Sequence, residues 1–172
     1  MKSLFCIGLL VATGFATILE GPGFWGRSEY YLLETSTWEE AEAEANSMNC
    51  HLVTINTPEE NTWVLETFSP NNSRNLWIGF TDKRVEGVFE WASGQTITYT
   101  NWGTGNPDDQ CGGQDYAYIV GNLVPMNGPS YRGEWDDCDN DGYMPSNTYF
   151  GVVEIDYVSL VHNSWASIKR SF

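Results

Sequence analysis

The sequence predicts a single domain of the α+β class, and three features of the chain support this. Two strong helix starts, at Thr37 and Thr57, fall in its first third. A long stretch rich in short, strand-like apolar runs follows, with irregular acidic loops late in the chain. A late strand over 149–155 could pair with a first strand over 29–34 and bring the two ends of the domain together. At 172 residues, without an internal repeat or linker, the chain suits one domain with a real core.

The first helix is predicted from its capping residues. Thr37 can accept a backbone N–H of the first turn, and Glu40, three residues on, completes a capping box. Alanines then favour helix until about residues 49–50. The run 51–55 alternates well enough for a short strand.

The second helix is predicted from Thr57 as the cap and Pro58 at the first helical position. Ser69 and Pro70 should end it. Strands are then expected at 76–80, 88–91, 96–99, 116–120 and 149–155. The segment 121–132 is rich in Gly, Pro and Asn and should be irregular.

The amino terminus has the pattern of a secretory signal, with a basic start at Lys2 and an apolar run over 4–12. Small residues ending at Ala16 provide a cleavage site, so we expect a signal over about 1–19. The domain should then span 27–157, with a tail of unclear role at 158–172. No run approaches the roughly 20 apolar residues of a membrane span. We therefore expect a secreted, extracellular protein without membrane insertion.

The formal net charge of −15 argues against binding to nucleic acid or to anionic membranes. Acidic residues are concentrated between 106 and 141, where Arg132 is the one base. Such a cluster is unfavourable without a counterion. Its members are Asp108, Asp109, Asp115, Glu134, Asp136, Asp137, Asp139 and Asp141. Carboxylate and amide oxygens on turns are the ligands that Ca²⁺ takes, so calcium is the expected cofactor.

An EF-hand is the competing explanation of the acidic segment, because residues 137–142 fit the first half of such a loop. Thr148 stands at the twelfth position, where Glu is needed, and no helical pattern flanks the segment. We therefore reject an EF-hand and expect Asp139 and Asp141 to be solvated.

Six short motifs follow one another along the chain: Trp38-Glu39-Glu40-Ala41, His51-Leu52-Val53, Trp77-Ile78-Gly79-Phe80, Asn101-Trp102, Asn106-Pro107-Asp108 and Trp135-Asp136-Asp137. In this order and spacing they resemble the motifs of a C-type lectin-like domain. The resemblance covers roughly 29–155. It implies two helices flanking antiparallel sheets, below a long calcium-binding loop region. It supports the fold more than sugar binding, because this fold carries many functions.

The resemblance also implies a principal calcium site around a proline that is usually cis. Its ligands, which would also face the sugar, would be Asn106, Asp108, Gln114, Asp136 and Asp137. Gln114 replaces the usual Glu and Asp136 replaces the usual Asn, so the total ligand charge is kept. An auxiliary calcium site would use Asp82, Glu86, Asp109 and Asp115, with Gln114 shared; ordinary turn chemistry is the alternative for Asp82 and Glu86.

In this family, adjacent sugar hydroxyls coordinate the loop-bound calcium ion directly. An acid before the proline and an amide after it suits mannose-like sugars, and the reverse order suits galactose-like ones. Asn106-Pro107-Asp108 has the amide first, so the resemblance leans towards galactose-type sugars. Tyr131, Tyr143 or Trp102 could supply an aromatic platform, although we expect Trp102 in the core.

The family pattern of disulfides is only partly present. The resemblance implies an inner bond, which Cys111 and Cys138 could form, although Cys111 lies five residues before the usual position near Tyr116. The outer bond cannot form because Val153 replaces its second cysteine. Cys50 is then either a buried thiol or an intermolecular link, and we favour the buried thiol.

The resemblance implies a lectin whose partners are glycans on cell surfaces or glycoproteins, with a homo-oligomer also possible. The alternative is a lectin-like domain that binds a protein, mineral or ice surface without sugar recognition. An enzyme is not expected. Paired carboxylates could suggest glycoside hydrolysis, but each acid is better used as a ligand. His51 and His162 have no nucleophile motif nearby.

Overall fold

The computed structural model describes residues 17–72, 74–110, 112–121, 132–142 and 149–156. The two helices are α1 (Trp38–Ser47) and α2 (Pro58–Phe68), and a short 3-10 turn, η1 (Pro70–Asn72), follows α2. The strands are β1 (Ile18–Trp25), β2 (Ser28–Thr35), β3 (His51–Leu52), β4 (Asn75–Thr81), β5 (Glu90–Trp91), β6 (Tyr116–Ile119), β7 (Trp135–Cys138) and β8 (Tyr149–Asp156).

Both helices begin where their capping residues predict. The Thr37 hydroxyl accepts the Glu40 N–H at 3.2 Å, and the Glu40 carboxylate accepts the Thr37 N–H at 3.1 Å, so the capping box is complete. Thr57 likewise accepts the Glu60 N–H at 3.1 Å, with Pro58 in the first turn. These contacts satisfy amide groups that a helix start otherwise leaves unpaired.

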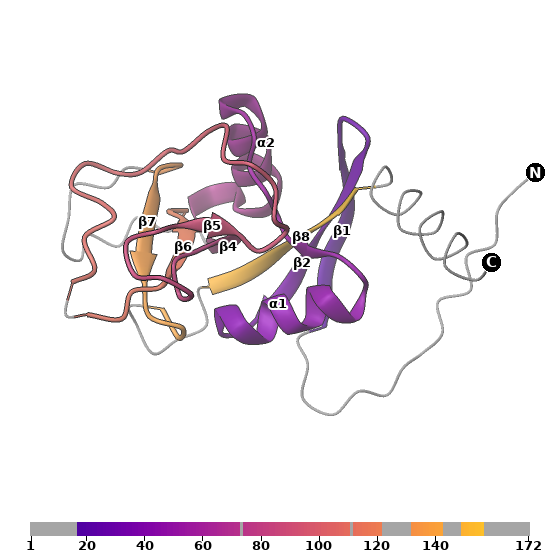
Figure 1. Cartoon of the computed structure of the whole chain (residues 1–172). Coiled ribbons are helices and arrows are strands. Elements are labelled where there is room, and N and C mark those ends of the chain that lie inside the picture. The colour runs from indigo at the N-terminus through magenta and orange to yellow at the C-terminus, as the bar shows by residue number, and fades with distance from the viewer. Residues whose placement is uncertain (1–16, 73, 111, 122–131, 143–148, 157–172) are drawn as a thin grey trace, which may run out of the picture.

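One sheet links the described strands in the order β1-β2-β8-β4-β6-β7, with β3 paired to β8 and β5 to β4. The β2–β8 pair is antiparallel from Ser28 opposite Asp156 to Thr35 opposite Phe150, which confirms the predicted pairing of the terminal strands. The β4–β8 pair is parallel. Figure 1 shows α1 and α2 on opposite sides of these strands, and β4 to β7 at the far end from the β1–β2 hairpin.

The core has two parts, one beneath each helix. Val64, Leu65 and Phe68 of α2 pack with a cluster that contains Phe80, Trp91 and Trp135. The cluster beneath α1 is formed by Trp38, Ala41 and Ala45 with Trp77, Tyr118, Cys138 and Tyr149. The second cluster therefore extends from α1 to the strands β6 and β7. We call α1, α2, β1, β2, β3 and β8 the helical half.

Three strand predictions differ from the structure. Strand β1 was not predicted, because Gly21, Pro22 and Gly23 interrupt its pattern; its bulged pairing with β2 tolerates them. Strand β1 lies before the predicted domain start at residue 27, and its first residue, Ile18, falls in the segment expected to be the signal. The run 96–99 is not a strand, and 135–138, predicted only as a ligand motif, forms β7.

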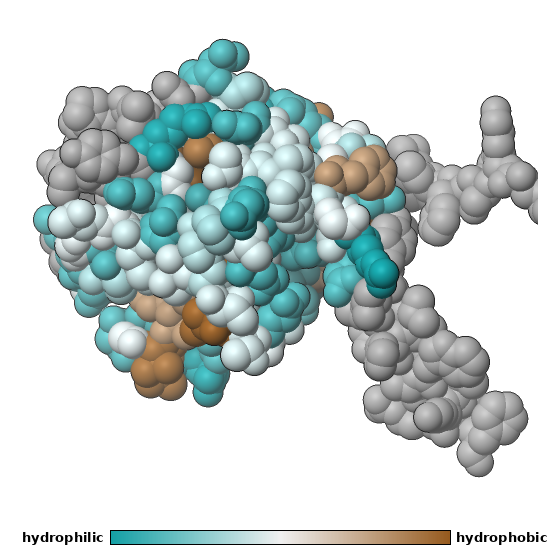
Figure 2. Space-filling model, turned by 90° about the horizontal axis from the view of Figure 1, so that it is seen from above, coloured by the Kyte–Doolittle hydropathy of each residue, from teal (hydrophilic) through white to brown (hydrophobic). Residues whose placement is uncertain are grey.

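The described surface is mainly polar, as the face shown in Figure 2 illustrates. Large exposed apolar side chains occur in two places: Ile18, Leu19 and Phe24 on β1, and Val85, Val88 and Ile97 in the segment 85–97. None of the helices in the described ranges has the length and apolar character needed to cross a membrane.

Candidate functional site

The segment 101–109 is anchored against β7 before it reaches the predicted ligands. The Trp135 N–H donates to the Asn101 carbonyl at 2.7 Å, and the Gly103 N–H donates to the Trp135 carbonyl at 2.8 Å. Trp135 is fully buried, and its indole N–H donates to Asn61 of α2 at 2.7 Å. This buried indole therefore fixes the position of the two acids that follow it, Asp136 and Asp137.

The Asn106–Pro107 peptide bond is cis, as the resemblance implies. Beyond it, the Asp108 N–H lies 3.1 Å from each carboxylate oxygen of Asp137, and the Asp109 N–H lies 2.9 Å from Oδ2. The Asn106 side-chain amide donates to Asp136 Oδ1. The structure thus brings Asn106, Asp108, Asp136 and Asp137 together, although they lie about thirty residues apart in the chain.

Gln114, the fifth predicted ligand, is buried at the base of the same loop. Its side-chain oxygen accepts the Gln110 N–H. Asp109, with φ 41°, bends the chain between them and accepts the Gly113 and Gln114 N–H groups at 2.6 and 3.1 Å. Gln114 and the Asp108 carboxylate, which accepts the Gln110 N–H at 3.2 Å, therefore order their own loop. The Asn106 side chain and the Asp108 N–H join that loop to β7.

The two acids of β7 are partly removed from water. The pKa of Asp136 is raised to about 6, chiefly by burial and also by the nearby Asp137 and Asp108, against a hydrogen bond from Tyr118 that lowers it. Burial also raises the pKa of Asp137, against the N–H groups of Asp109 and Asp108, which lower it. A nearby cation would favour the ionised form of both groups.

The four acids of the predicted auxiliary site also lie near one another. Asp82 raises the pKa of the exposed Glu86 most strongly, followed by burial, Asp109 and Asp115. Burial and then Asp82 raise the pKa of Asp115. The Asp82 N–H donates to the Asp115 carbonyl at 3.2 Å, which joins the two segments.

Asp82 is unusual among these acids because it is only 2% exposed. One carboxylate oxygen accepts the Gly87 N–H at 2.8 Å, which is the turn chemistry offered as the alternative. The other oxygen is buried and has no hydrogen-bond partner among the described residues. A buried carboxylate oxygen without a donor is costly, so turn chemistry alone does not account for Asp82.

We call the segments 82–87, 106–110, 112–115 and 135–142 the acidic loops. Asp137 lies in a strand and not at the end of a helix, which agrees with the rejection of an EF-hand. Asp139 and Asp141 are exposed, as expected. Within the described ranges, no three His, Cys, Asp or Glu side chains form a ready-made metal cluster.

The cysteines differ from the implied inner disulfide. Cys138 is a free thiol, fully buried beneath α1, and the Tyr149 hydroxyl bonds to it. Its side chain belongs to the core and Tyr116 lies opposite it on β6, so the bond with Cys111 is not formed here; Cys111 itself lies outside the described residues. Cys50 is a buried thiol, as favoured, and donates to the Ala45 carbonyl at 3.1 Å.

Of the aromatic residues considered as a sugar platform, Trp102 packs against the core, with its ring 4.8 Å from Phe89 and 6.0 Å from Trp135. Tyr131 and Tyr143 lie outside the described residues. One residue near the site was not predicted from the sequence. It is Tyr118, whose hydroxyl donates to Asp136 at 2.9 Å. Recognising 135–138 as a strand opposite 116–119 would have revealed this pair.

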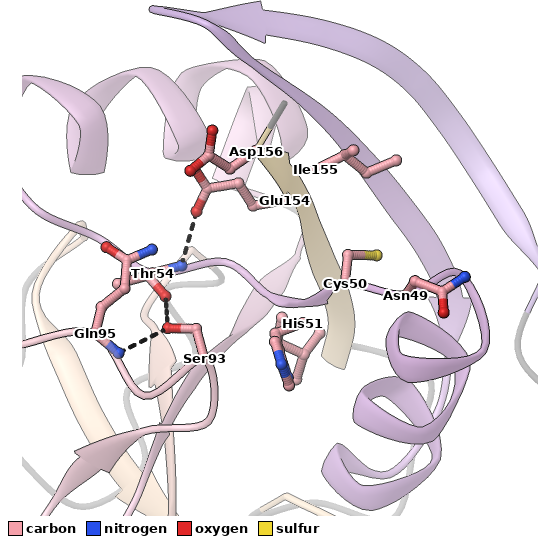
Figure 3. Close-up of a pocket in the computed structure, with 10 residues that line it drawn as sticks. Asn49, Cys50, His51, Thr54, Ser93, Gln95, Glu154, Ile155 and Asp156 are labelled. Atoms are coloured by element: carbon pink, nitrogen blue, oxygen red, sulfur yellow. Dashed lines mark hydrogen bonds between the residues drawn. The ribbon is translucent and has the colours of Figure 1, made fainter. Parts of the chain in front are cut away.

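A cavity of about 320 Å³ lies between β3, β8 and the segment 93–95 that follows β5, away from the predicted ligands. Figure 3 shows His51, Thr54, Ser93 and Glu154 on its wall. Thr54 bonds to Ser93 through their hydroxyls at 2.7 Å, and its N–H donates to Glu154 at 3.3 Å. Thr54, Ser93 and Glu154 already bond to one another and His51 pairs with Glu42 at 2.6 Å, so the acidic loops remain the better candidate site.

Comparison with known proteins agrees with the fold described above. The family model described as "Lectin C-type domain" matches residues 34–141. The carbohydrate-recognition domain of the mouse scavenger receptor C-type lectin is 28% identical, with 78% of this chain and 92% of that one covered and a TM-score of 0.62.

Two further solved structures are similar. The carbohydrate-recognition domain of cow CD23, determined in the presence of GlcNAc2Man3 oligosaccharide, is 26% identical, with coverages of 81% and 96% and a TM-score of 0.64. Human lithostathine is 23% identical, with coverages of 81% and 91% and a TM-score of 0.63, which supports the fold alone.

Proposed function

This chain belongs to the C-type lectin domain family, and from that premise we propose that it binds carbohydrate through a calcium ion held by the acidic loops. The family is generally non-enzymatic and its domains are typically calcium-dependent. The observation that carries the proposal is the convergence of Asn106 and Asp108 with Asp136 and Asp137 beside a cis proline. These side chains offer carboxylate and amide oxygens, the donor set of a hard cation.

The principal ion would be held by Asn106, Asp108, Gln114, Asp136 and Asp137. A second ion would be held by Asp82, Glu86, Asp109 and Asp115. The unpartnered oxygen of Asp82 supports the fit, because a cation supplies the compensation that the protein does not. Since the described carboxylates are not already grouped as a metal cluster, binding would require some of these side chains to reorient.

Calcium would supply a Lewis-acidic centre to which two adjacent sugar hydroxyls bind. The protein's contribution is to orient the sugar, because Asn106 and Asp108 lie on either side of Pro107 and can hydrogen-bond to those hydroxyls. With the amide before the proline and the acid after it, the site leans towards galactose-type sugars. Its partners would be glycans of cell surfaces or glycoproteins, met outside the cell if the predicted signal is used.

The test is thermal unfolding of the full chain in Ca²⁺, in Mg²⁺ and in a chelator. Binding to the folded state raises stability by mass action, by about 2.7 kcal/mol when the free ion exceeds its Kd one hundredfold. Asp137→Asn should remove most of this increment. Asp141→Asn, which removes one exposed acid from the same segment, should leave it unchanged.

A glycan array read with and without chelator then tests the sugar. We expect galactose-terminated glycans to bind in Ca²⁺ and binding to disappear in chelator. Sugar binding that persists in chelator would refute the calcium-coordinated mechanism. Calcium-dependent stabilisation without binding to any glycan would favour the alternative, a lectin-like domain for a protein, mineral or ice surface.

A further inference from the structure

Tyr118 has a place in the molecule that its sequence context does not reveal. It lies on β6 directly opposite Asp136 of β7, in the register of the β6–β7 pair. Its side chain is 5% exposed. The ring meets Tyr149 edge-on at 5.0 Å and Trp77 at 6.0 Å, within the cluster beneath α1. The position of the hydroxyl is therefore set by the packed core.

That hydroxyl donates to Asp136 Oδ2 at 2.9 Å, since a tyrosine keeps its proton at neutral pH. On the other side of the carboxylate, Oδ1 accepts the Asn106 side-chain amide, and the Asp137 N–H lies 3.1 Å away. Asp136 is thus held by a donor from the core and by a donor from the loop that carries Pro107. Both donors are satisfied only if both side-chain oxygens at position 136 can accept.

We infer that Tyr118 is a positioning residue for the candidate calcium site and that it explains why position 136 carries an acid in place of an amide. An asparagine would offer one acceptor and one NH₂ group to two donors. If that NH₂ faced Tyr118, the hydroxyl could no longer donate to position 136. If it faced Asn106, the Asn106 amide would have to turn its oxygen towards position 136, so the oxygen expected to bind calcium would be used in that hydrogen bond. The inference rests on the proposed function, because its consequence is the orientation of a calcium ligand.

The effect of Tyr118 on calcium should resemble that of other groups that orient metal ligands, whose loss lowers metal affinity by about 10- to 100-fold. Tyr118→Phe removes the hydroxyl and keeps the ring. We expect it to weaken calcium binding about tenfold, measured by isothermal titration of the full chain with Ca²⁺. Tyr149→Phe is the matched control. It removes a hydroxyl from the same aromatic cluster, but this hydroxyl bonds to Cys138 and not to Asp136.

A purely structural role would lower the stability of both variants in chelator and leave both calcium affinities unchanged.

A second test separates a positioning role from a structural one by changing both Tyr118 and Asp136. Asp136→Asn should weaken calcium binding, and adding Tyr118→Phe should restore part of that loss, because it removes the donor that conflicts with the amide. This rescue does not depend on the stability of the Tyr118→Phe single variant.

Three results would decide the matter. A selective loss in Tyr118→Phe, together with rescue in the double variant, supports the inference. Suppose the wild type binds Ca²⁺ but the calcium affinity of Tyr118→Phe is unchanged, or the losses of affinity in Tyr118→Phe and Asp136→Asn multiply in the double variant. Either result overturns the inference and leaves the proposed function intact. A wild type that does not bind Ca²⁺ overturns both.

Discussion

The carboxylates of the helical half and those of the predicted auxiliary site differ in how many protein donors they have. In the helical half, Glu60 accepts the Tyr30 hydroxyl at 2.7 Å with one oxygen and the Asn56 N–H at 2.8 Å with the other. Glu42 lies 2.6 Å from His51 and accepts the Leu52 N–H at 2.9 Å. Each of these acids has a protein donor for both of its oxygens.

In the acidic loops, Asp136 and Asp137 also have donors for both oxygens, whereas the acids of the predicted auxiliary site have fewer. Asp82, Asp109 and Asp115 together raise the pKa of Glu86, and one oxygen of Asp82 has no partner within the described residues. The same residue types therefore serve two purposes. Where donors are supplied by the fold, an acid stabilises the native structure; where they are missing, the acid is available to a cation at some cost in stability.

The largest expected effect is that of Glu60→Ala. It leaves the Asn56 N–H without its acceptor and the buried Tyr30 hydroxyl with only its longer bond to Glu154 at 3.3 Å, so the free energy of unfolding should fall by about 2–4 kcal/mol. The fall should be the same in Ca²⁺ and in chelator, measured by urea denaturation. Glu59→Ala, at an exposed neighbouring position, should change little. Loss of the calcium increment in Glu60→Ala would show that the two groups of carboxylates are not independent.

An intermediate effect is expected from Glu154. Burial, and after it the nearby Glu60, raises the pKa of its carboxyl group from 4.5 to about 7. Between these two values the unfolded chain releases a proton that the folded protein retains. Stability from this group is thus complete below pH 4.5 and is lost as the pH rises to about 7. Glu154→Gln should be more stable than wild type by about 1–3 kcal/mol at pH 8 and equal to it at pH 4.

Urea denaturation from pH 4 to pH 8 measures this difference. Glu34→Gln, at an exposed position on the neighbouring strand β2, is the control and should follow the wild-type curve. An unchanged slope between pH 4.5 and 7 in Glu154→Gln would mean that Glu154 ionises in the folded protein as it does in the unfolded chain.

The smallest effect is the most informative, because it should change sign with calcium. Asp82→Asn keeps an acceptor for the Gly87 N–H and removes a buried charge from among three other acids. In chelator we expect it to stabilise the protein by about 1 kcal/mol. In Ca²⁺ it should reduce the calcium increment. A variant that is less stable than wild type in chelator would place Asp82 among the structural acids of the helical half.

What the sequence determined depended on contacts that span a few residues or on a motif of fixed spacing. The capping box of Thr37 and Glu40 and the cap at Thr57 each lie within one helical turn, so the local sequence alone placed both helix starts. The six ordered motifs identified the family, and with it the cis bond at Pro107.

Only the tertiary structure decided how those pieces meet. The burial of Asp82, the packing of Cys138 into the core and the bond from Tyr118 to Asp136 each depend on the register of segments far apart in the chain. A side chain's burial and its cross-strand neighbour are properties of the packed sheet, and a shift of one residue would reverse the face on which it lies. For that reason the sequence named the candidate ligands, whereas the fold determined which of their oxygens already have a donor.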